Sequence, residues 1–551
     1  MSLHDECGVI AVYHLPDELS SSLCPAQGRE EVSRLVPRML LDLQNRGQLA
    51  AGLTTYSPTR NQLIDTYKEV GTVSEVFKLR NKAEHETLMQ EYAGRAAIGH
   101  VRYATVGRED RSFAQPFERH HIKKHKWFSF AFNGQLANFT DLREKLLADG
   151  NTYLALDTDT EIIMHAICET LSPQKEPNLM EVCKMTASVF DGAYSLVFLN
   201  ALGQMFVARD PLGMKPLCYA VEGSLFAAAS ESVALFNLGF SENSIKTVEP
   251  GQVIFVSDRG IRFERFAESA KTAHCFFEWV YFANVASTMD GRSVYMARKN
   301  LGEELAILEL ERNTVAMDSD TIVVPVPDTS KASADAMAYR LGIPSREGLI
   351  RNRYTGRTFI EGEESRMRKS QTKYTPLREV LEGKKIFLVE DSVVRSTTMR
   401  VLLKRIRELG HAGEIHVRVA CPPIIAPCFY GINMPTYGEL FAPKHLCRCR
   451  SDEKQMMPEV KWQMTPEDGW QMTPEDGWQM TPEDEWQMTP EIEKRMADDL
   501  GADSIRYLPL ESVARAIGMD ASRLCLACLT ADYPTPWGTK MSLSAREAEQ
   551  G

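Results

Sequence analysis

The stretch KKIFLVEDSVVRSTTMR, residues 384–400, predicts a strand, a polar loop and a helix in succession. Residues 386–389 form an apolar run of strand length, typical of a central strand in a parallel sheet. Across residues 399–409 apolar side chains recur at helical spacing, and Gly410 is a stop signal for that helix. A strand followed directly by a helix indicates an α/β arrangement around this stretch.

Two carboxylates and a hydroxyl-rich loop stand between that strand and that helix. Glu390 and Asp391 come where the strand would end, and residues 392–398 are polar. Carboxylates accept hydrogen bonds from ribose hydroxyls, and a loop that leads into a helix offers N–H groups to a phosphate. Acidic residues are also common at strand ends without any function. Taken alone, the stretch therefore fits a ribose-phosphate site and an ordinary surface turn equally well.

The composition is that of a globular protein with more than one domain. The chain has 551 residues, 25% charged and 44% hydrophobic, with a net charge of -12. That charge argues against a nucleic-acid binder or a membrane-surface protein. No apolar run approaches the roughly 20 residues of a membrane span, and the N-terminus lacks the basic region of a secretory signal. We expect a cytoplasmic enzyme whose 12 cysteines are buried, catalytic or metal-binding.

Strand-like and helix-like patterns divide most of the chain into two parts. Residues 7–265 contain many short strand-like runs, which helical patterns interrupt at residues 34–44, 142–147 and 160–171. This mixture predicts an α+β domain. Residues 273–446 alternate between strand and helix, with an Ala-rich helix at 333–340, and predict a parallel sheet with crossover helices.

Residues 462–493 repeat the octapeptide WQMTPEDG with small changes. A period of eight with a proline in each unit suits neither a helix nor a solenoid that buries a core. We expect residues 450–491 to be an acidic, disordered insertion. Its tryptophans leave open a linear motif for a partner protein. Residues 492–533 resume ordinary domain sequence, and we expect residues 534–551 to be a polar tail.

Cys7 precedes a strand-like run and is, by itself, typical of a buried core cysteine. Four motifs follow it in order: LQNRGQLAAGL (43–53), GHVRYATVG (99–107), FNGQLAN (132–138) and TDTE (158–161). Together with Cys7 they resemble the class II glutamine amidotransferases, whose nucleophile is an N-terminal cysteine. The resemblance covers residues 7–255 and implies an αββα N-terminal-nucleophile glutaminase fold.

In that family the free α-amino group of the cysteine is the base for its own thiol. An α-amino group has a pKa of about 7.7–8.0, so a useful fraction is neutral at physiological pH. Cys7 would attack the carboxamide of glutamine and release ammonia. Because six residues precede Cys7, we expect residues 1–6 to be a propeptide that is cleaved after Glu6.

The resemblance also assigns the residues that bind glutamine. The Asn133 side chain and the Gly134 N–H would form the oxyanion hole. Arg102 would hold the α-carboxylate with its planar guanidinium, and Asp159 would hold the α-ammonium group. Outside this ordered set of motifs, Arg102 and Asp159 would be interpreted as surface ion-pair residues.

Two further motifs, IVVPVPDTSKASADAMAYRLGIP (322–344) and GLIRNRYTGRTFI (348–360), extend the resemblance. With residues 384–400 they are similar to the glutamine phosphoribosyl-pyrophosphate (PRPP) amidotransferases, in which an α/β phosphoribosyltransferase domain, here 273–446, follows the glutaminase. The reaction implied converts PRPP, glutamine and water into 5-phosphoribosylamine, glutamate and pyrophosphate in purine synthesis. Ammonia would pass between the sites through an internal channel. A homo-oligomer, dimer or tetramer, with nucleotide feedback is the family expectation.

The family pattern places PRPP on the loops at 328–331 and 390–398. Glu390 and Asp391 would bind the ribose hydroxyls or one Mg²⁺ per subunit, because the charge of a pyrophosphate leaving group must be neutralised. The other candidates contact phosphate groups: Asp328 in the pyrophosphate loop, Ser392, Arg395, Thr397 and Thr398 around the 5-phosphate, and Arg357 and Lys373 as further contacts.

Cys525 and Cys528 form a C-x-x-C pair, which alone is compatible with zinc, a redox pair or no function. Cys275 and Cys428 stand in contexts that resemble those of the iron–sulfur branch of the family. The resemblance implies one [4Fe–4S] cluster per subunit on these four cysteines, with zinc as the alternative. The remaining cysteines have no such role: Cys447 and Cys449 lack a family counterpart, and Cys24, Cys168, Cys183, Cys218 and Cys421 would be buried thiols.

Several family positions carry other residues in this chain. Ser396 replaces a glycine of the phosphate loop, and a serine there would be strained if the backbone were left-handed. The other changes are Glu390 for the first aspartate of the acidic pair, Asn45 and Phe132 for histidines, and Thr329-Ser330 for Ser-Gly. Two hypotheses follow: an active PRPP amidotransferase, or a regulatory paralogue with glutaminase activity or PRPP sensing but no transferase activity.

Overall fold

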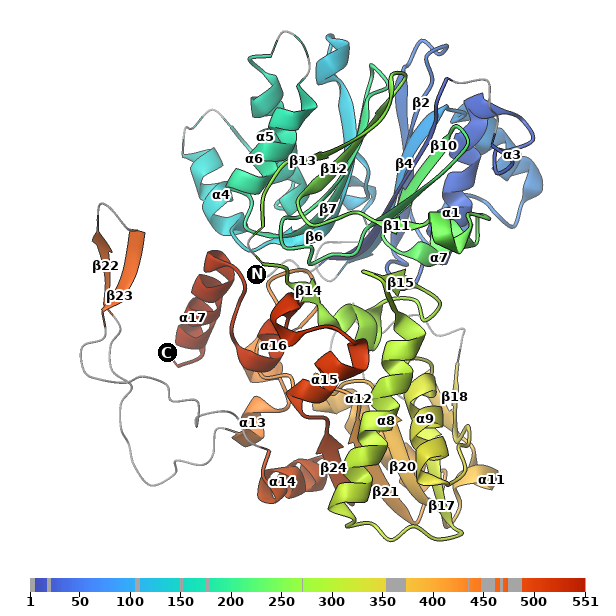
Figure 1. Ribbon diagram of the computed structural model, residues 1–551, viewed down its shortest axis with the longest axis vertical. Coiled ribbons are helices and arrows are strands. Elements are labelled where there is room, and N and C mark those ends of the chain that lie inside the picture. Colours follow the sequence, from blue (N-terminus) through green and yellow to red (C-terminus); the bar gives the residue numbers. More distant parts are fainter. Residues whose placement is uncertain are drawn as a thin grey trace.

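The computed structural model describes residues 5–16, 21–104, 110–148, 150, 152–174, 176, 178–269, 271–352, 373–434, 436–446, 461–465, 469–473 and 488–550. Arg357, Cys447 and Cys449 lie outside these residues. The chain folds into two halves, which lie one above the other in Figure 1. The N-terminal half contains two large antiparallel sheets, and the C-terminal half contains one parallel sheet.

The two sheets of the N-terminal half pack face to face. The first has the strand order β11-β9-β10-β1-β4-β2-β3, and the second has the order β13-β12-β8-β7-β6-β5. The strands of the first sheet are β1 (Asp5–His14), β2 (Ala50–Tyr56), β3 (Ile64–Val70), β4 (Ala96–Ala104), β9 (Cys218–Glu222), β10 (Leu225–Ala229) and β11 (Lys246–Thr247). Those of the second are β5 (Phe117–Arg119), β6 (Phe128–Leu136), β7 (Gly192–Asn200), β8 (Met205–Arg209), β12 (Gln252–Ser257) and β13 (Gly260–Arg265).

Helices cover the outer face of each sheet, so the predicted αββα order is confirmed. Strand β1 shows why: Val9 and Ala11 point into the layer between the sheets, whereas Ile10 and Val12 pack under the helices. The first sheet is covered by α1 (Val36–Asp42), α2 (Val73–Val76), α3 (Lys82–Glu91) and α7 (Ser232–Phe236), and the second by α4 (Phe139–Leu147), α5 (Asp159–Leu171) and α6 (Leu179–Val189).

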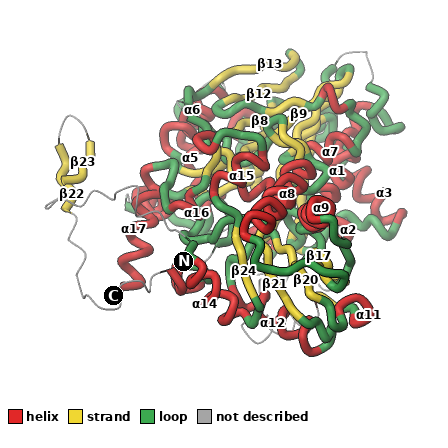
Figure 2. The backbone as a smooth tube through the Cα atoms, turned by 60° about the horizontal axis from the view of Figure 1, so that its bottom comes forward, coloured by secondary structure: helices red, strands yellow, loops and turns green. Residues whose placement is uncertain are grey.

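The C-terminal half is built on a parallel sheet with the order β17-β20-β21-β24. Its strands are β17 (Thr321–Pro325), β20 (Lys385–Glu390), β21 (Glu414–Val419) and β24 (Ser504–Tyr507). Strand β20 lies inside the sheet and is followed by α12 (Ser396–Glu408), as the opening stretch predicts. Helices α8 (Val294–Arg312) and α9 (Lys331–Leu341) cover one face of the sheet, and α12 and α14 (Pro490–Leu500) lie on the other (Figure 2).

Short elements connect the halves and close the C-terminal segment. They are β14 (His274–Cys275), which pairs in parallel with β25 (Leu524–Cys525), the turn Glu278–Phe282, the β15–β16 hairpin (Thr288–Met289 and Arg292–Ser293), the β18–β19 hairpin (Leu349–Arg351 and Tyr374–Pro376), α11 (Arg378–Leu381), α13 (Pro443–Leu446), α15 (Leu510–Ile517), α16 (Ala527–Thr530) and α17 (Pro536–Gln550). Within the described part of the chain, no helix is long and apolar enough to cross a membrane.

One expectation is corrected outside the main sheets. The expected polar tail contains α17, because Trp537, Met541 and Ala545 recur every four residues and pack against the core. In the repeat insertion, β22 (Lys461–Thr465) and β23 (Gly469–Thr473) pair as an antiparallel hairpin, and the expected disorder of the insertion stays a prediction. The hairpin stands apart from both halves (Figure 1). The rest of the insertion lies outside the described residues.

Candidate active sites and a four-cysteine cavity

Cys7 is fully buried in β1, an interior strand of the first sheet. The β1–β4 register places Cys7 directly opposite Arg102. The buried Arg102 guanidinium lies 5.3 Å from the centre of the Phe113 ring. The predicted nucleophile and the predicted carboxylate clamp are therefore neighbours through backbone pairing alone.

Asn133 and Gly134 come from β6 in the facing sheet. Asn133 is fully buried, and its Nδ2 donates to Ser230 Oγ at a long 3.4 Å. Ser230 Oγ also accepts the N–H of Val9 at 3.0 Å, so it joins the nucleophile strand to the predicted oxyanion strand. Among the described atoms Asn133 Oδ1 has no hydrogen-bond partner. No signal in the sequence pointed to Ser230, which immediately follows β10.

Two local features fix the geometry of β6. A Cβ atom on Gly134 would lie 1.9 Å from the carbonyl oxygen of Ala193, so only glycine fits there. Asp159 is the first residue of α5, and its Oδ2 accepts the N–H of Leu136 at 2.9 Å. A carboxylate at a helix N-terminus is favoured by the helix dipole. The predicted ammonium ligand thus also holds the end of the oxyanion strand.

A buried charge network lies behind Cys7 that the sequence did not predict. Arg46 is fully buried, and its Nε donates to the Cys7 carbonyl oxygen at 3.0 Å. Its Nη1 and Nη2 donate to Glu231 and Glu278 at 2.7 and 2.6 Å. Burial alone would lower the pKa of Arg46, but the two carboxylates raise it. Asn45, which stands in place of the family histidine, joins the same network by donating to Glu231 at 2.9 Å.

The second candidate site lies at the carboxyl end of β20. Asp391 is buried and accepts hydrogen bonds from Ser392 Oγ at 2.6 Å and from Thr329 Oγ1. The loop before α9 and the acidic pair therefore meet at one edge of the parallel sheet, where α/β folds bind ligands. Burial raises the pKa of both Glu390 and Asp391, and the charge of Asp391 raises that of Glu390 further.

The predicted phosphate contacts surround this edge. Asp328 accepts from Arg351 at 2.8 Å. Arg395 immediately precedes α12 and pairs with Glu439 at 3.0 Å. The remaining candidates are more open: Thr397 and Thr398 are exposed in the first turn of α12, and Lys373 lies 4.9 Å from the Tyr374 ring centre, where its charge opposes the rise in the pKa of Glu390.

The altered loop residues are not strained. Ser396 is the first residue of α12, and neither it nor Thr329 or Ser330 has a positive φ. A left-handed backbone was the condition under which serine would be unfavourable at position 396. That condition is not met, because the helix begins one residue after Arg395 and gives Ser396 an ordinary helical conformation.

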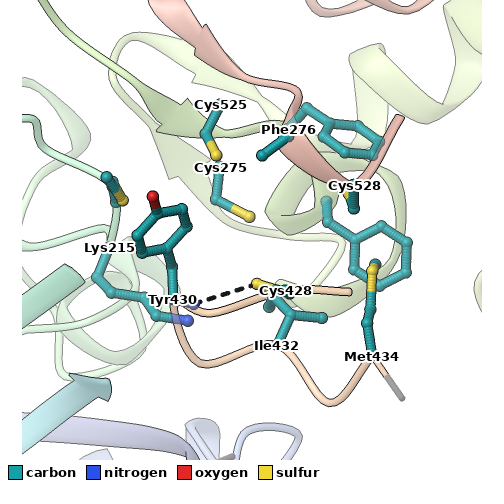
Figure 3. A pocket seen from close by; sticks show the side chains of 12 residues that line it. Lys215, Cys275, Phe276, Cys428, Tyr430, Ile432, Met434, Cys525 and Cys528 are labelled. Carbon is teal, nitrogen blue, oxygen red and sulfur yellow. Dashed lines mark hydrogen bonds between the residues drawn. The ribbon is translucent and has the colours of Figure 1, made fainter. Parts of the chain in front are cut away.

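The four predicted cluster cysteines line one cavity of about 20 Å³ (Figure 3). They come from separate segments: Cys275 in β14 lies beside Cys525 in β25, Cys528 lies in α16, and Cys428 lies in the loop after β21. Burial raises the pKa of Cys525 to about 12 and also raises those of Cys275 and Cys528. The rest of the lining is mostly apolar and includes Phe276, Phe277, Ile432 and Met434, with Lys215 as its charged member.

The four thiols supply a donor set that suits two kinds of metal centre. Four cysteine ligands bind a single zinc ion in structural zinc sites. An iron–sulfur cluster instead offers each thiolate its own iron. The lining of the cavity, with four thiols from separate segments, is compatible with either group.

Comparisons with known proteins agree with both halves of the fold. The glutamine amidotransferase domain family matches residues 65–249. A Methanothermobacter thermautotrophicus protein named amidophosphoribosyltransferase is 34% identical and covers 98% of this chain and 97% of its own. A solved glutamine PRPP amidotransferase from Bacillus subtilis, complexed with ADP and GMP, has a TM-score of 0.73 and 30% identity over 96% of this chain and 98% of its own. A structure described as the allosteric regulatory enzyme of purine biosynthesis has a TM-score of 0.74 and 31% identity, covering 96% of each chain.

Proposed function

The chain belongs to the amidophosphoribosyltransferase family, and we propose that it converts PRPP, glutamine and water into 5-phosphoribosylamine, glutamate and pyrophosphate. The observation that supports this proposal is that one chain holds two separate groups of candidate residues. Cys7 lies opposite Arg102 in one group, and the acidic pair Glu390–Asp391 lies at the edge of the parallel sheet in the other. The family relatives favour this enzyme over a regulatory paralogue without transferase activity.

The glutaminase half-reaction begins after residues 1–6 are removed. The freed α-amine of Cys7 takes the thiol proton, and the thiolate attacks the carboxamide carbon of glutamine. Asn133 Nδ2 and the Gly134 N–H then donate to the oxyanion. The weak bond from Asn133 to Ser230 supports this role, because the amide loses little when it turns to the substrate. The amine passes its proton to the departing ammonia, and water hydrolyses the thioester to give glutamate.

Two charged residues would orient glutamine before attack. Arg102, opposite Cys7, would bind the α-carboxylate with two N–H groups. Asp159, at the end of the oxyanion strand, would bind the α-ammonium group. Both side chains are buried, so water does not screen these contacts as it would at an exposed surface.

The transferase half-reaction takes place at the acidic pair. Glu390 and Asp391 are adjacent, and burial raises the pKa of both, so a divalent cation fits their excess negative charge. Bound Mg²⁺, one per subunit, would supply charge neutralisation for pyrophosphate. Ser392, Arg395 and the first turn of α12 would hold the 5-phosphate while ammonia attacks the ribose carbon that carries pyrophosphate.

The four cysteines would hold one [4Fe–4S] cluster per subunit. Their separate origins give it a structural role, because it would tie Cys525 and Cys528 of the C-terminal segment to Cys275 and Cys428. Iron and sulfide analysis together with absorbance near 400 nm, about where iron–sulfur thiolate centres absorb, tests this assignment against zinc.

Other family properties extend the proposal. The solved Bacillus subtilis relative contains ADP and GMP, which supports feedback by purine nucleotides in this chain. We also propose a cytoplasmic homo-oligomer, a dimer or a tetramer. Its partners would be its two small-molecule substrates, with no nucleic acid or membrane among them.

One assay tests the central proposal. Purified protein, shown by intact mass to begin at Cys7, should release glutamate and pyrophosphate in equal amounts when both glutamine and PRPP are present. Glutamate release without pyrophosphate would support the regulatory paralogue instead. Full activity of a protein that still carries residues 1–6 would contradict the proposed role of the α-amine.

A further inference from the structure

Lys215 is a buried lysine in the loop between β8 and β9. Only 1% of its surface is exposed, and its Nζ donates to the carbonyl oxygen of Gly431 at 3.3 Å. Within the described ranges it forms no ion pair with an Asp or Glu side chain. A buried ammonium group is costly unless an opposite charge compensates it. A negative charge beside Lys215 would offset this cost.

The nearest acidic side chain in the same loop is already engaged. Asp210 accepts the backbone N–H groups of Leu212 and Met214 at 3.0 Å each. The four-cysteine cavity is the other neighbour, since Lys215 lines it together with all four thiols (Figure 3). Burial raises the pKa of Cys275 and Cys525, and the charge of Lys215 acts in the opposite direction on both.

The N-terminal half of the chain holds the ammonium group of Lys215 in position. Lys215 lies between β8 and β9 of the N-terminal half, whereas the four cysteines belong to the C-terminal half. The residue that accepts from Lys215 is itself anchored, because the Gly431 N–H donates to Gln135 Oε1 at 2.9 Å. Gln135 follows Gly134 on the oxyanion strand β6. Lys215 and Gln135 thus bind the carbonyl oxygen and the N–H of one residue, Gly431.

We propose that Lys215 is the counter-charge of the four-cysteine site, so that the N-terminal half completes a metal centre whose ligands all come from the C-terminal half. The proposal rests on the [4Fe–4S] cofactor proposed above. A cluster with four thiolates carries a net charge of about −2, which becomes about −3 when it accepts one electron. A neighbouring ammonium group stabilises the reduced form more than the oxidised form.

Three variants of the full-length, cluster-loaded protein separate charge from hydrogen bonding. Lys215→Met removes both, Lys215→Gln keeps a donor for Gly431 without the charge, and Lys215→Arg keeps the charge. The control is Lys126→Met, which removes a partly exposed lysine that donates to the carbonyl oxygen of Ser172 at 2.6 Å. Dithionite supplies the electron in a potentiometric titration. A second measurement follows the loss of absorbance near 400 nm in an iron chelator, at a wavelength estimated from iron–sulfur thiolate ligation.

We expect Lys215→Met and Lys215→Gln to shift the midpoint potential of the cluster to more negative values and to increase the rate of cluster loss about tenfold. Lys215→Arg and Lys126→Met should stay near the wild-type values. If Lys215→Met does not fold, Lys215→Gln decides the question. A Gln variant that matches the wild type would show that hydrogen bonding alone matters and would overturn the proposal. Wild-type protein that binds no iron and sulfide would contradict the cofactor itself, and with it the role of Lys215.

Discussion

Arg46 donates to the carbonyl oxygen of Cys7 at 3.0 Å and, from the same guanidinium, to Glu278 at 2.6 Å. Glu278 belongs to the turn that joins the two halves, and this turn is held in place by Arg298 of α8, which donates to the carbonyl oxygens of Trp279 and Ala283. The nucleophile strand and the transferase half thus share one buried arginine. A change in the turn would reach the backbone of Cys7 through a single side chain.

Replacing Arg46 by methionine should destabilise the protein strongly. The substitution leaves Glu231 and Glu278 buried without their cation, and breaking a buried pair in this way costs about 3–5 kcal/mol. Arg515→Met is the matched control, because Arg515 pairs with Glu304 at the surface, where such a pair contributes about 1 kcal/mol or less. Chemical denaturation measures both values. Equal decreases in the free energy of unfolding for the two variants would show that the buried network stabilises the protein no more than the surface pair does.

Asn133→Ala should separate the two half-reactions. Loss of one oxyanion donor lowers glutaminase kcat by about 100- to 1,000-fold. Activity with PRPP and added ammonium salt should stay near wild type, because Asn133 lies on β6 of the N-terminal half and its side chain contacts Ser230 of the same half. Asn237→Ala, at an exposed asparagine, is the control. A parallel fall in the ammonia-dependent rate would mean that Asn133 acts on folding rather than on the oxyanion.

The buried His100 should make stability depend on pH. Burial, with the charges of Arg102 and Lys68, lowers its pKa to about 3, whereas an unfolded histidine has a pKa of about 6.5. Below pH 6.5 the unfolded chain therefore binds the proton and the folded protein does not. The contribution of neutral His100 to the free energy of unfolding is fully present above pH 6.5. It is lost as the pH falls toward 3, at up to about 1.4 kcal/mol per pH unit.

His100→Gln should remove this part of the pH dependence. Denaturation at pH 7.5, 6 and 5 would show a shallower loss of stability for the variant than for the wild type. Substituting the exposed His120 by glutamine serves as the control and should leave the slope unchanged. Identical slopes for wild type and His100→Gln would mean that the buried imidazole becomes protonated inside the folded protein.

Ser396→Gly should not improve PRPP binding. Since Ser396 has an ordinary helical backbone, glycine relieves no strain there. Glycine instead costs up to about 1 kcal/mol in a helix and loosens the first turn of α12. We expect PRPP affinity that is unchanged or a few-fold weaker, measured by calorimetry with Mg²⁺. Tighter binding in the glycine variant would show that the serine hinders the phosphate.

Local patterns in the sequence were sufficient for the main strands and for the grouping of the candidate site residues, whose roles as ligands stay predictions. The apolar run before Glu390 predicted the interior strand β20, and the order of motifs placed Cys7, Arg102 and Asn133 in one site, where the structure brings them together. The tail helix was missed because its polar majority hid the four-residue spacing of Trp537, Met541 and Ala545.

Long-range electrostatic partners were beyond such patterns. Arg46 lies 185 residues before Glu231 and 232 residues before Glu278. No periodicity in the sequence connects these three residues. Lys215 likewise lies in a segment to which no local pattern assigned a role. The role proposed for Lys215 depends on its burial and on the cavity that it lines, and both arise only after the two halves have packed together.

Strand β1 runs through the expected cleavage point, since Glu6 pairs with Tyr103 and Asp5 with Ala104 in the same register that sets Cys7 opposite Arg102. The candidate glutamine-binding residue Arg102 is thus in place while the amine of Cys7 is still part of a peptide bond. On the proposed mechanism, the protein folds before it becomes active. Each newly made chain would be inactive until residues 1–6 are cleaved off, and no incompletely folded protein would release ammonia.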